Sequence, residues 1–132
     1  MKKLAFILFF FVAFTIQSQQ FTTLLNAVYT SNTNGTALAI ASDNAWSVQL
    51  VWTSATGTVN GVVYIEVSDD GANWIAHSST ANLTMSGASG SGGYDTGNVS
   101  MSWRFVRARY VKGTTTSANI KVYFNQLIKK TN

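Results

Sequence analysis

Two adjacent acids and a glycine, Asp69, Asp70 and Gly71, stand between a β-branched run and a tryptophan. Calcium in proteins takes six to eight oxygen ligands, and carboxylates are among the side chains that supply them. Asp69 and Asp70 are therefore candidate metal ligands for Ca²⁺. A complete site would need further oxygens from Asp43, from Asp95 or from backbone carbonyls, and no D-x-D-x-D spacing is present.

The same residues are also typical of a tight turn between two strands. An Asp side chain can bond amides further along its own backbone, and Gly71 can adopt the positive φ that such turns need. Asn73 can cap the return, and Trp74 then re-enters the core. A hairpin loop of three to five residues accounts for every residue of the stretch. We therefore expect a structural turn and no bound cofactor, with Ca²⁺ as the alternative.

Residues suited to catalysis are scarce. His77 is the single histidine and the chain has no cysteine, whereas zinc needs three or four ligands that are usually His or Cys. A nucleophile–histidine–acid arrangement would have to use His77, which lies on an expected strand. Glu66 and Asp95 are the formal pair for glycoside hydrolysis, while Asp69 and Asp70 are adjacent and cannot face each other across a substrate. The chain is therefore predicted not to be an enzyme.

A glycine-rich stretch, Ser86–Ser100, contains the residues best suited to binding. We expect it to be a long flexible loop, since loops of this length in compact domains are often functional. Tyr94, Asp95 and Asn98 are the candidate ligand-binding residues, because aromatic rings stack on sugars while carboxylates and amides bond hydroxyl groups. The alternative is that Tyr94 folds back onto the edge of the domain.

Three arginines, Arg104, Arg107 and Arg109, could form a basic stripe. Arg107 and Arg109 fall on one face of an expected strand and Arg104 on the other. We expect them to pair across strands with acids such as Glu66 or the two acids of the turn. The remaining basic residues form no dense patch, so nucleic acid is not an expected partner.

The first 19 residues have the layout of a secretory signal peptide. Lys2 and Lys3 precede an apolar run, Leu4–Ile16, which is shorter than a bilayer span, and a polar exit follows. We expect residues 1–19 to be removed and residues 20–132 to form one domain, secreted, periplasmic or on the surface of a bacterium. The alternative is an uncleaved anchor. Without the two lysines the net charge falls from +4 to +2.

Alternating apolar and polar residues predict strands throughout residues 20–132, and no segment shows a helical period. The clearest run is Trp46–Trp52, and Val63–Val67 and Ile120–Phe124 alternate in the same way. The apolar rows need a facing layer, which predicts an all-β, single-domain antiparallel β-sandwich of jelly-roll kind. Its four tryptophans are expected in the core. The expected strands are residues 21–29, 36–41, 45–53, 62–68, 74–78, 83–85, 101–112 and 118–130, with turns at 31–35, 54–57 and 113–117.

Two of these segments resemble a known family. EVSDDGANW (Glu66–Trp74) resembles the S-x-D-G-x-N-W hairpin of discoidin-like (F5/8 type C) domains, and WRFVRARY (Trp103–Tyr110) resembles the A-R-Y-V-R-I strand that follows it there. The pair, preceded by WSVQLVWTSATGTVNG, is also similar to phage virion proteins of β-sandwich type. The resemblance covers about Ala45–Phe124. It implies a β-sandwich and, for the discoidin-like group, carbohydrate binding, and no ligand residue transfers.

Together these features predict an exported, non-catalytic binding or adhesion module. Its expected partner is a glycan or another cell-surface ligand, bound through loops at one end of the sandwich. The alternative is a phage virion or surface-assembly subunit that makes protein–protein contacts with itself or with virion proteins. No membrane span is expected after signal cleavage.

Overall fold

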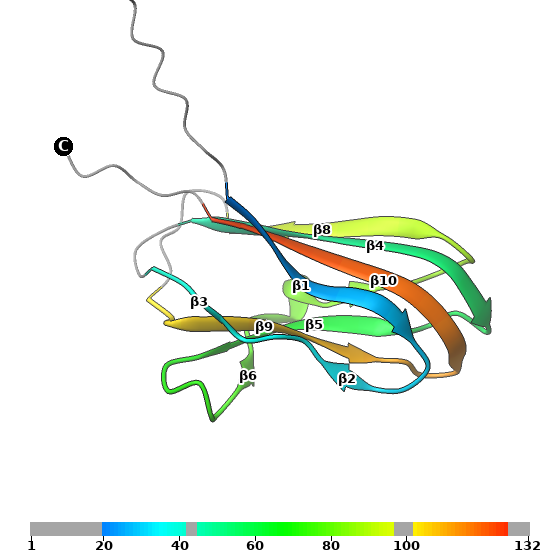
Figure 1. Ribbon diagram of the computed structural model, residues 1–132, viewed down its shortest axis with the longest axis horizontal. Helices are drawn as coiled ribbons and strands as arrows, with labels where there is room; N and C mark the ends of the chain where they lie inside the picture. Colours follow the sequence, from blue (N-terminus) through cyan, green and yellow to red (C-terminus); the bar gives the residue numbers. More distant parts are fainter. Residues whose placement is uncertain (1–19, 42–44, 97–101, 127–132) are drawn as a thin grey trace, which may run out of the picture.

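The computed structural model describes residues 20–41, 45–96 and 102–126. Two antiparallel sheets lie one above the other, which confirms the predicted β-sandwich (Figure 1). The helical element of the described part is a single 3₁₀ turn, η1 (Ser79–Ala81), and none of the described segments forms a helix able to span a membrane. The expected signal peptide, residues 1–19, lies outside the described residues.

The first sheet contains the long strands of the chain. Its order is β1 (Gln20–Tyr29), β10 (Thr115–Gln126), β4 (Trp46–Gly57) and β8 (Gly90–Asp95), so β1 and β8 are its edges. Each pair is antiparallel, and the neighbours β10 and β4 share a register in which Val122 lies opposite Leu50.

The second sheet is built around two central strands. Its order is β2 (Thr33–Asn34), β9 (Phe105–Val111), β5 (Val62–Ser68) and β6 (Ile75–Ala76). Two further short strands extend it, because β3 (Leu38–Ala39) pairs with β9 and β7 (Leu83–Thr84) pairs with β5.

Alternation along the strands determines what is buried between the sheets. In β4 the residues at every second position from Trp46 to Trp52 are buried while their neighbours are exposed or half-buried, and β9 and most of β10 follow the same rule. In β5 the alternation holds from Val62 to Ile65, after which Glu66 and Ser68 are buried as well as Val67. Apart from Met85, which follows β7, the largest fully buried side chains come from these four strands: Trp46, Leu50, Val63, Ile65, Val67, Val106, Tyr110, Thr115, Ile120, Val122 and Phe124. The predicted inward rows of β4, β5 and β10 are therefore confirmed.

Several predicted boundaries are wrong. The expected loop Ser86–Ser100 contains β8, and the expected turn Ser54–Gly57 is the end of β4, which continues beside β10 through register shifts. Thr36–Ala41 holds only the two residues of β3, and β9 begins at Phe105 because the preceding described residues do not pair. In β8 and at the end of β4, pairing with a distant strand outweighed local propensity. In β3 and at the start of β9 the opposite holds, because residues with a strand-like pattern form fewer ladder pairs than expected.

The tryptophan prediction is correct for the first sheet only. Trp46 and Trp52 are buried, at 1% and 4% exposure. Trp103 is half-buried against the core, whereas Trp74 lies half-buried with the Arg107 guanidinium 4.3 Å from the centre of its ring. A strand residue after a turn can stack under a long side chain instead of entering the core.

Trp52 requires a glycine on the neighbouring strand. Trp52 lies opposite Gly90, and a Cβ on Gly90 would collide with the indole ring. The ring cannot swing away freely, because its Nε1 donates a hydrogen bond to the Gly87 carbonyl at 3.1 Å. Gly93 differs, since a Cβ there would meet nothing closer than the Val48 carbonyl at 3.4 Å.

Replacing Gly90 by alanine should therefore destabilise the protein, whereas replacing Gly93 by alanine should change its stability little. We expect Gly90→Ala to lower the free energy of unfolding by about 1–3 kcal/mol, because the added methyl overpacks the Trp52 site. Gly93→Ala, the matched control, should stay within about 0.5 kcal/mol of the original chain. Urea unfolding followed by tryptophan fluorescence measures both values. Equal losses in the two variants would contradict the packing role of Gly90.

Candidate functional site

β8 contains two of the predicted ligand residues, and the structure places them on opposite faces. β8 pairs with β4 so that Tyr94 lies opposite Val48 and Asp95 opposite Ser47. Val48 is buried and Ser47 lies on the outer side, so Tyr94 turns toward the core while Asp95 is exposed. The third predicted residue, Asn98, lies outside the described residues.

Tyr94 belongs to an aromatic cluster at the end of the core. Its ring centre is 5.8 Å from that of Trp46 and 5.5 Å from that of His77, and its hydroxyl is 3.2 Å from His77 Nε2. Burial lowers the pKa of His77 below its usual value of 6.5. Tyr94 is thus half-buried and folded back onto the sandwich, which was the alternative placement, and its role in ligand binding stays a prediction.

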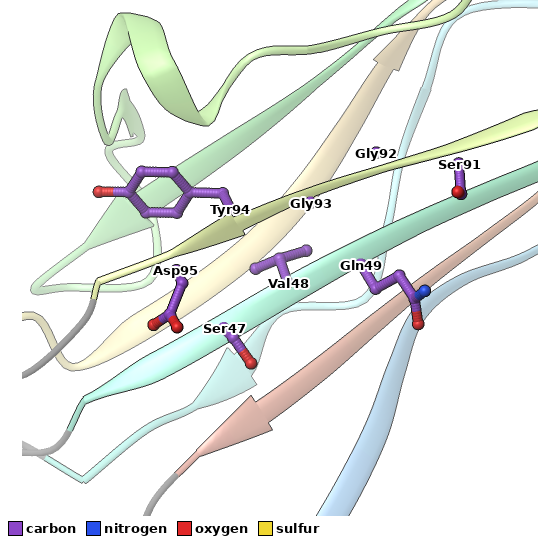
Figure 2. Close-up of a pocket in the computed structure, with 8 residues that line it drawn as sticks. All are labelled: Ser47, Val48, Gln49, Ser91, Gly92, Gly93, Tyr94 and Asp95. Carbon is purple, nitrogen blue, oxygen red and sulfur yellow. The ribbon is translucent and has the colours of Figure 1, made fainter.

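The outer side of β4 and β8 has a shallow hollow of about 520 Å³ (Figure 2). Gly93 leaves room at its centre, since no side chain fills the space between Ser91 and Asp95. Hydroxyl, amide and carboxylate groups surround it, so it can donate and accept hydrogen bonds. The lining residues are Ser47, Val48, Gln49, Ser91, Gly92, Gly93, Tyr94 and Asp95.

The stretch Asp69–Gly71 forms a turn between β5 and β6 that side-chain hydrogen bonds stabilise. Asp70 Oδ1 accepts hydrogen bonds from Ser68 Oγ at 2.9 Å and from the amides of Ala72 and Asn73 at 2.8 Å. Asp70 Oδ2 accepts from Asn73 Nδ2 at 2.7 Å, and Gly71 has φ 72°. The Asn73 amide, with the other donors, holds the pKa of Asp70 well below its usual range. The predicted structural turn is therefore present.

The calcium assignment stays a prediction. Both Asp70 oxygens already accept hydrogen bonds from the turn, and Asp69 takes part in none of those bonds. Within residues 20–41, 45–96 and 102–126 no three His, Cys, Asp or Glu side chains gather as metal ligands. A cation at this turn would have to compete with four donors for the Asp70 carboxylate.

Glu66 is engaged in a stacked ion-pair ladder on the outer face of the second sheet. Arg107 binds Glu66 Oε2 through Nε at 2.8 Å and Nη2 at 2.7 Å, and Arg109 Nε binds Oε1 at 2.5 Å. The two guanidinium groups lie over Trp74 at 4.3 Å and Tyr64 at 4.6 Å. The predicted pairing with Glu66 is confirmed for Arg107 and Arg109, whereas the Arg104 guanidinium lies 6.0 Å from the centre of the Phe105 ring.

The exposed backbone of strand β8 was not predicted from the sequence. The stretch GSGGYD has four residues without bulky side chains, which favours a loop on local grounds. The signal that could have indicated a strand is the period of two, which places Gly90, Gly92 and Tyr94 on one face and Ser91, Gly93 and Asp95 on the other. Because Gly93 is exposed and has no side chain, the surface it presents is peptide backbone.

No protein-family model and no curated protein matches the chain. Among solved structures, the crystal structure of the PBSX exported protein XepA has a similar fold, with a TM-score of 0.56 and 20% sequence identity. The similarity covers 86% of this chain and 38% of the XepA chain, so this chain spans well under half the length of that protein. At this identity the likeness shows the fold alone. It supports the phage-related resemblance at the level of a β fold, and the discoidin-like type is not confirmed.

Loss of the Asp70 carboxylate should loosen the turn. We expect Asp70→Ala to lower the melting temperature, because four hydrogen bonds are lost and two backbone amides are left without their acceptor. Asp69→Ala is the neighbouring control and should change it little. Since the folded-state pKa of Asp70 is depressed, its stabilisation is complete above pH 3.8 and declines as the pH falls below that value. Thermal melts by circular dichroism test this, and equal losses in the two variants would contradict it.

His77 should make the protein less stable in mild acid. Its folded-state pKa lies below 6.5, so just below pH 6.5 the unfolded chain binds a proton at His77 more readily than the folded chain does. The stabilisation is therefore complete above pH 6.5 and declines as the pH falls toward the folded-state pKa. His77→Gln should flatten the fall in melting temperature between about pH 7 and pH 5, because His77 is the single histidine. An unchanged slope in the variant would show that other groups cause it.

Proposed function

We propose that the chain is an exported, non-catalytic structural module of a phage-related or cell-surface assembly and that it acts through protein–protein contacts. The observation that carries this proposal is the likeness in fold to an exported protein of PBSX over 86% of the chain. The apolar leader-like run at residues 4–16 agrees with export. XepA is described as an exported protein of PBSX, so a leader-like run and a phage-related fold can occur in the same protein.

The outer face of the first sheet supports a role in contacts. On β4, β8 and β10 this face consists of hydroxyl, amide and small residues, with Lys121 and Asp95 as its charged side chains. Protein–protein interfaces are depleted of charged residues at their centres and enriched in tyrosine, which Tyr123 provides here. A flat face with little charge costs less to dehydrate than one covered with lysine and glutamate.

Catalysis is not part of the proposal. His77 points its ring into the Trp46–Tyr94 cluster, and Glu66 is neutralised by two arginines. Each of these groups has a structural partner that accounts for its position. None of them lies among the residues that line the hollow beside β8.

Glycan recognition is the second candidate, and the polar hollow favours it. Ser47, Gln49, Ser91 and Asp95 can bond sugar hydroxyls from one side of the sheet. The hollow offers no outward-facing aromatic ring on which a sugar could stack, since the Tyr94 ring is turned toward Trp46. The assembly proposal needs no such ring, so it explains the observed face better.

Fractionation of a culture of the native host tests the proposed function. We expect the processed chain in particle or envelope fractions, in complexes far larger than the 14.3 kDa full chain. The double variant Gln49→Glu with Asn125→Glu adds charge to the outer face of the first sheet. It should reduce co-sedimentation roughly tenfold, through like-charge repulsion and added dehydration cost.

Thr30→Glu with Ser31→Glu is the matched control, because both residues are exposed beyond β1 and the charge change is the same. Recovery of the original chain solely as a free small protein would contradict the assembly role. Binding to a glycan array that is lost in Asp95→Ala and kept in Asp69→Ala would favour the second candidate instead.

A further inference from the structure

The first sheet ends in two edge strands, β1 and β8. An edge strand displays backbone N–H and C=O groups that can pair with another chain, and proteins that must avoid such pairing protect their edges. Bulges, covering segments, charged side chains and proline are the usual protections. The two edges of this sheet differ sharply in how far they are protected.

β1 is protected along its centre. Its register with β10 shifts between Thr23 and Leu25, which is a bulge at Leu24. The Leu24 carbonyl accepts a hydrogen bond from the Thr36 amide at 3.3 Å. The Asn26 amide donates to the Tyr29 hydroxyl at 3.2 Å. Backbone groups that would pair with an added strand are therefore already engaged.

Within residues 90–95, β8 has fewer of these protections, and Asp95 at its end is its one charged side chain. Its register with β4 is continuous from Gly90 to Asp95, without a bulge. The segment contains no lysine, arginine or proline. Ser91 and Gly93 are exposed, and for Gly93 the exposed surface is necessarily backbone. A partner strand would meet no bulky side chain along the middle of this edge (Figure 2).

The hydrogen-bond pattern shows which groups face outward. The Thr96 amide donates to the Trp46 carbonyl at 3.0 Å, so the backbone of residue 96 faces β4. In an antiparallel ladder the direction alternates, so residues 90, 92 and 94 also face β4. The N–H and C=O groups of Ser91 and Gly93 consequently point away from β4, along the open edge.

We propose that β8 pairs antiparallel with β8 of a second copy of this chain across a twofold axis at Gly92. The two first sheets then form one continuous sheet, and residues 91 and 93 of each copy exchange backbone hydrogen bonds with residues 93 and 91 of the other. This inference deepens the proposed function, because it names one of the contacts through which the assembly forms. A twofold pairing is also the commonest symmetry of soluble oligomers.

A second copy is the occupant because β8 complements itself in this register. Gly90 lies opposite Tyr94 of the other copy, so the larger residue meets a residue without a side chain. Asp95 lies opposite Ser89, and the two Asp95 carboxylates are about 20 Å apart along the strands. That separation exceeds the screening length of about 8 Å at physiological salt, so their repulsion is small.

Disulfide trapping tests the pairing directly, since the chain has no cysteine. In the proposed register the two Gly92 residues face each other as a non-hydrogen-bonded pair, with Cα atoms about 4.5 Å apart, which a disulfide can bridge. A Cβ at residue 92 would meet Leu83 at 3.8 Å, an ordinary contact. Gly92→Cys should therefore form a covalent dimer in air. Val28→Cys, exposed on the opposite edge, is the control and should remain monomeric.

Sedimentation equilibrium of the exported protein gives the second readout. We expect a dimer mass for the original chain and for Gly93→Ala. Gly93→Pro removes an N–H that points away from β4, so the fold should persist while the dissociation constant rises roughly tenfold or more. Circular dichroism confirms that this variant is folded.

A monomer mass for the original chain at all concentrations, or equal trapping of Val28→Cys and Gly92→Cys, would overturn the proposal. Its failure is distinguishable from failure of the proposed function. A monomer that still co-sediments with particles or envelope would contradict the β8 pairing alone. A dimer found only as a free protein would contradict the assembly role alone.

Discussion

The packing of Trp52 beneath the edge of the first sheet is the constraint on which much of this structure depends. β4 lies inside that sheet and directs Trp46 and Trp52 toward the core. The indole of Trp52 reaches under the adjacent strand and occupies the space where a side chain of residue 90 would lie. The edge strand must therefore contain glycine. A strand that contains glycine where it covers a tryptophan exposes more of its backbone to solvent than a strand with larger side chains.

The exposed backbone of β8 links the packing of the core to the properties of the surface. The same glycine-rich strand that covers Trp52 also borders the polar hollow and leaves the N–H and C=O groups of Ser91 and Gly93 at an open edge. Gly93 is informative because the packing does not require it, so its missing side chain is best understood through what it leaves accessible. The opposite edge, with its bulge and two hydrogen-bonded caps, shows that this chain can protect an edge. The asymmetry favours contact through β8.

The residues that first suggested chemistry serve structure instead. Asp70 holds its own turn through four hydrogen bonds, and Glu66 binds two arginines that lie over Trp74 and Tyr64. Both acids stabilise the second sheet and its β5–β6 turn. With these groups engaged, the outer face of β4 and β8 presents mainly hydroxyl, amide and backbone groups, with Asp95 as a charged residue. The likeness to the PBSX exported protein XepA concerns the fold alone.

The sequence by itself determined the strands whose evidence is local. The rows around Leu50, Ile65 and Val122 alternate with polar residues, so their buried faces could be read directly, and the Asp70 turn follows from side-chain bonds to nearby amides. Only the tertiary structure decided that residues 90–95 form a strand, because glycine and serine have little strand propensity and pair here with a strand some forty residues earlier in the chain. The same register turns Tyr94 inward and Asp95 outward. Strand order and the protection of each edge were likewise decided by contacts between distant residues, which no local pattern encodes.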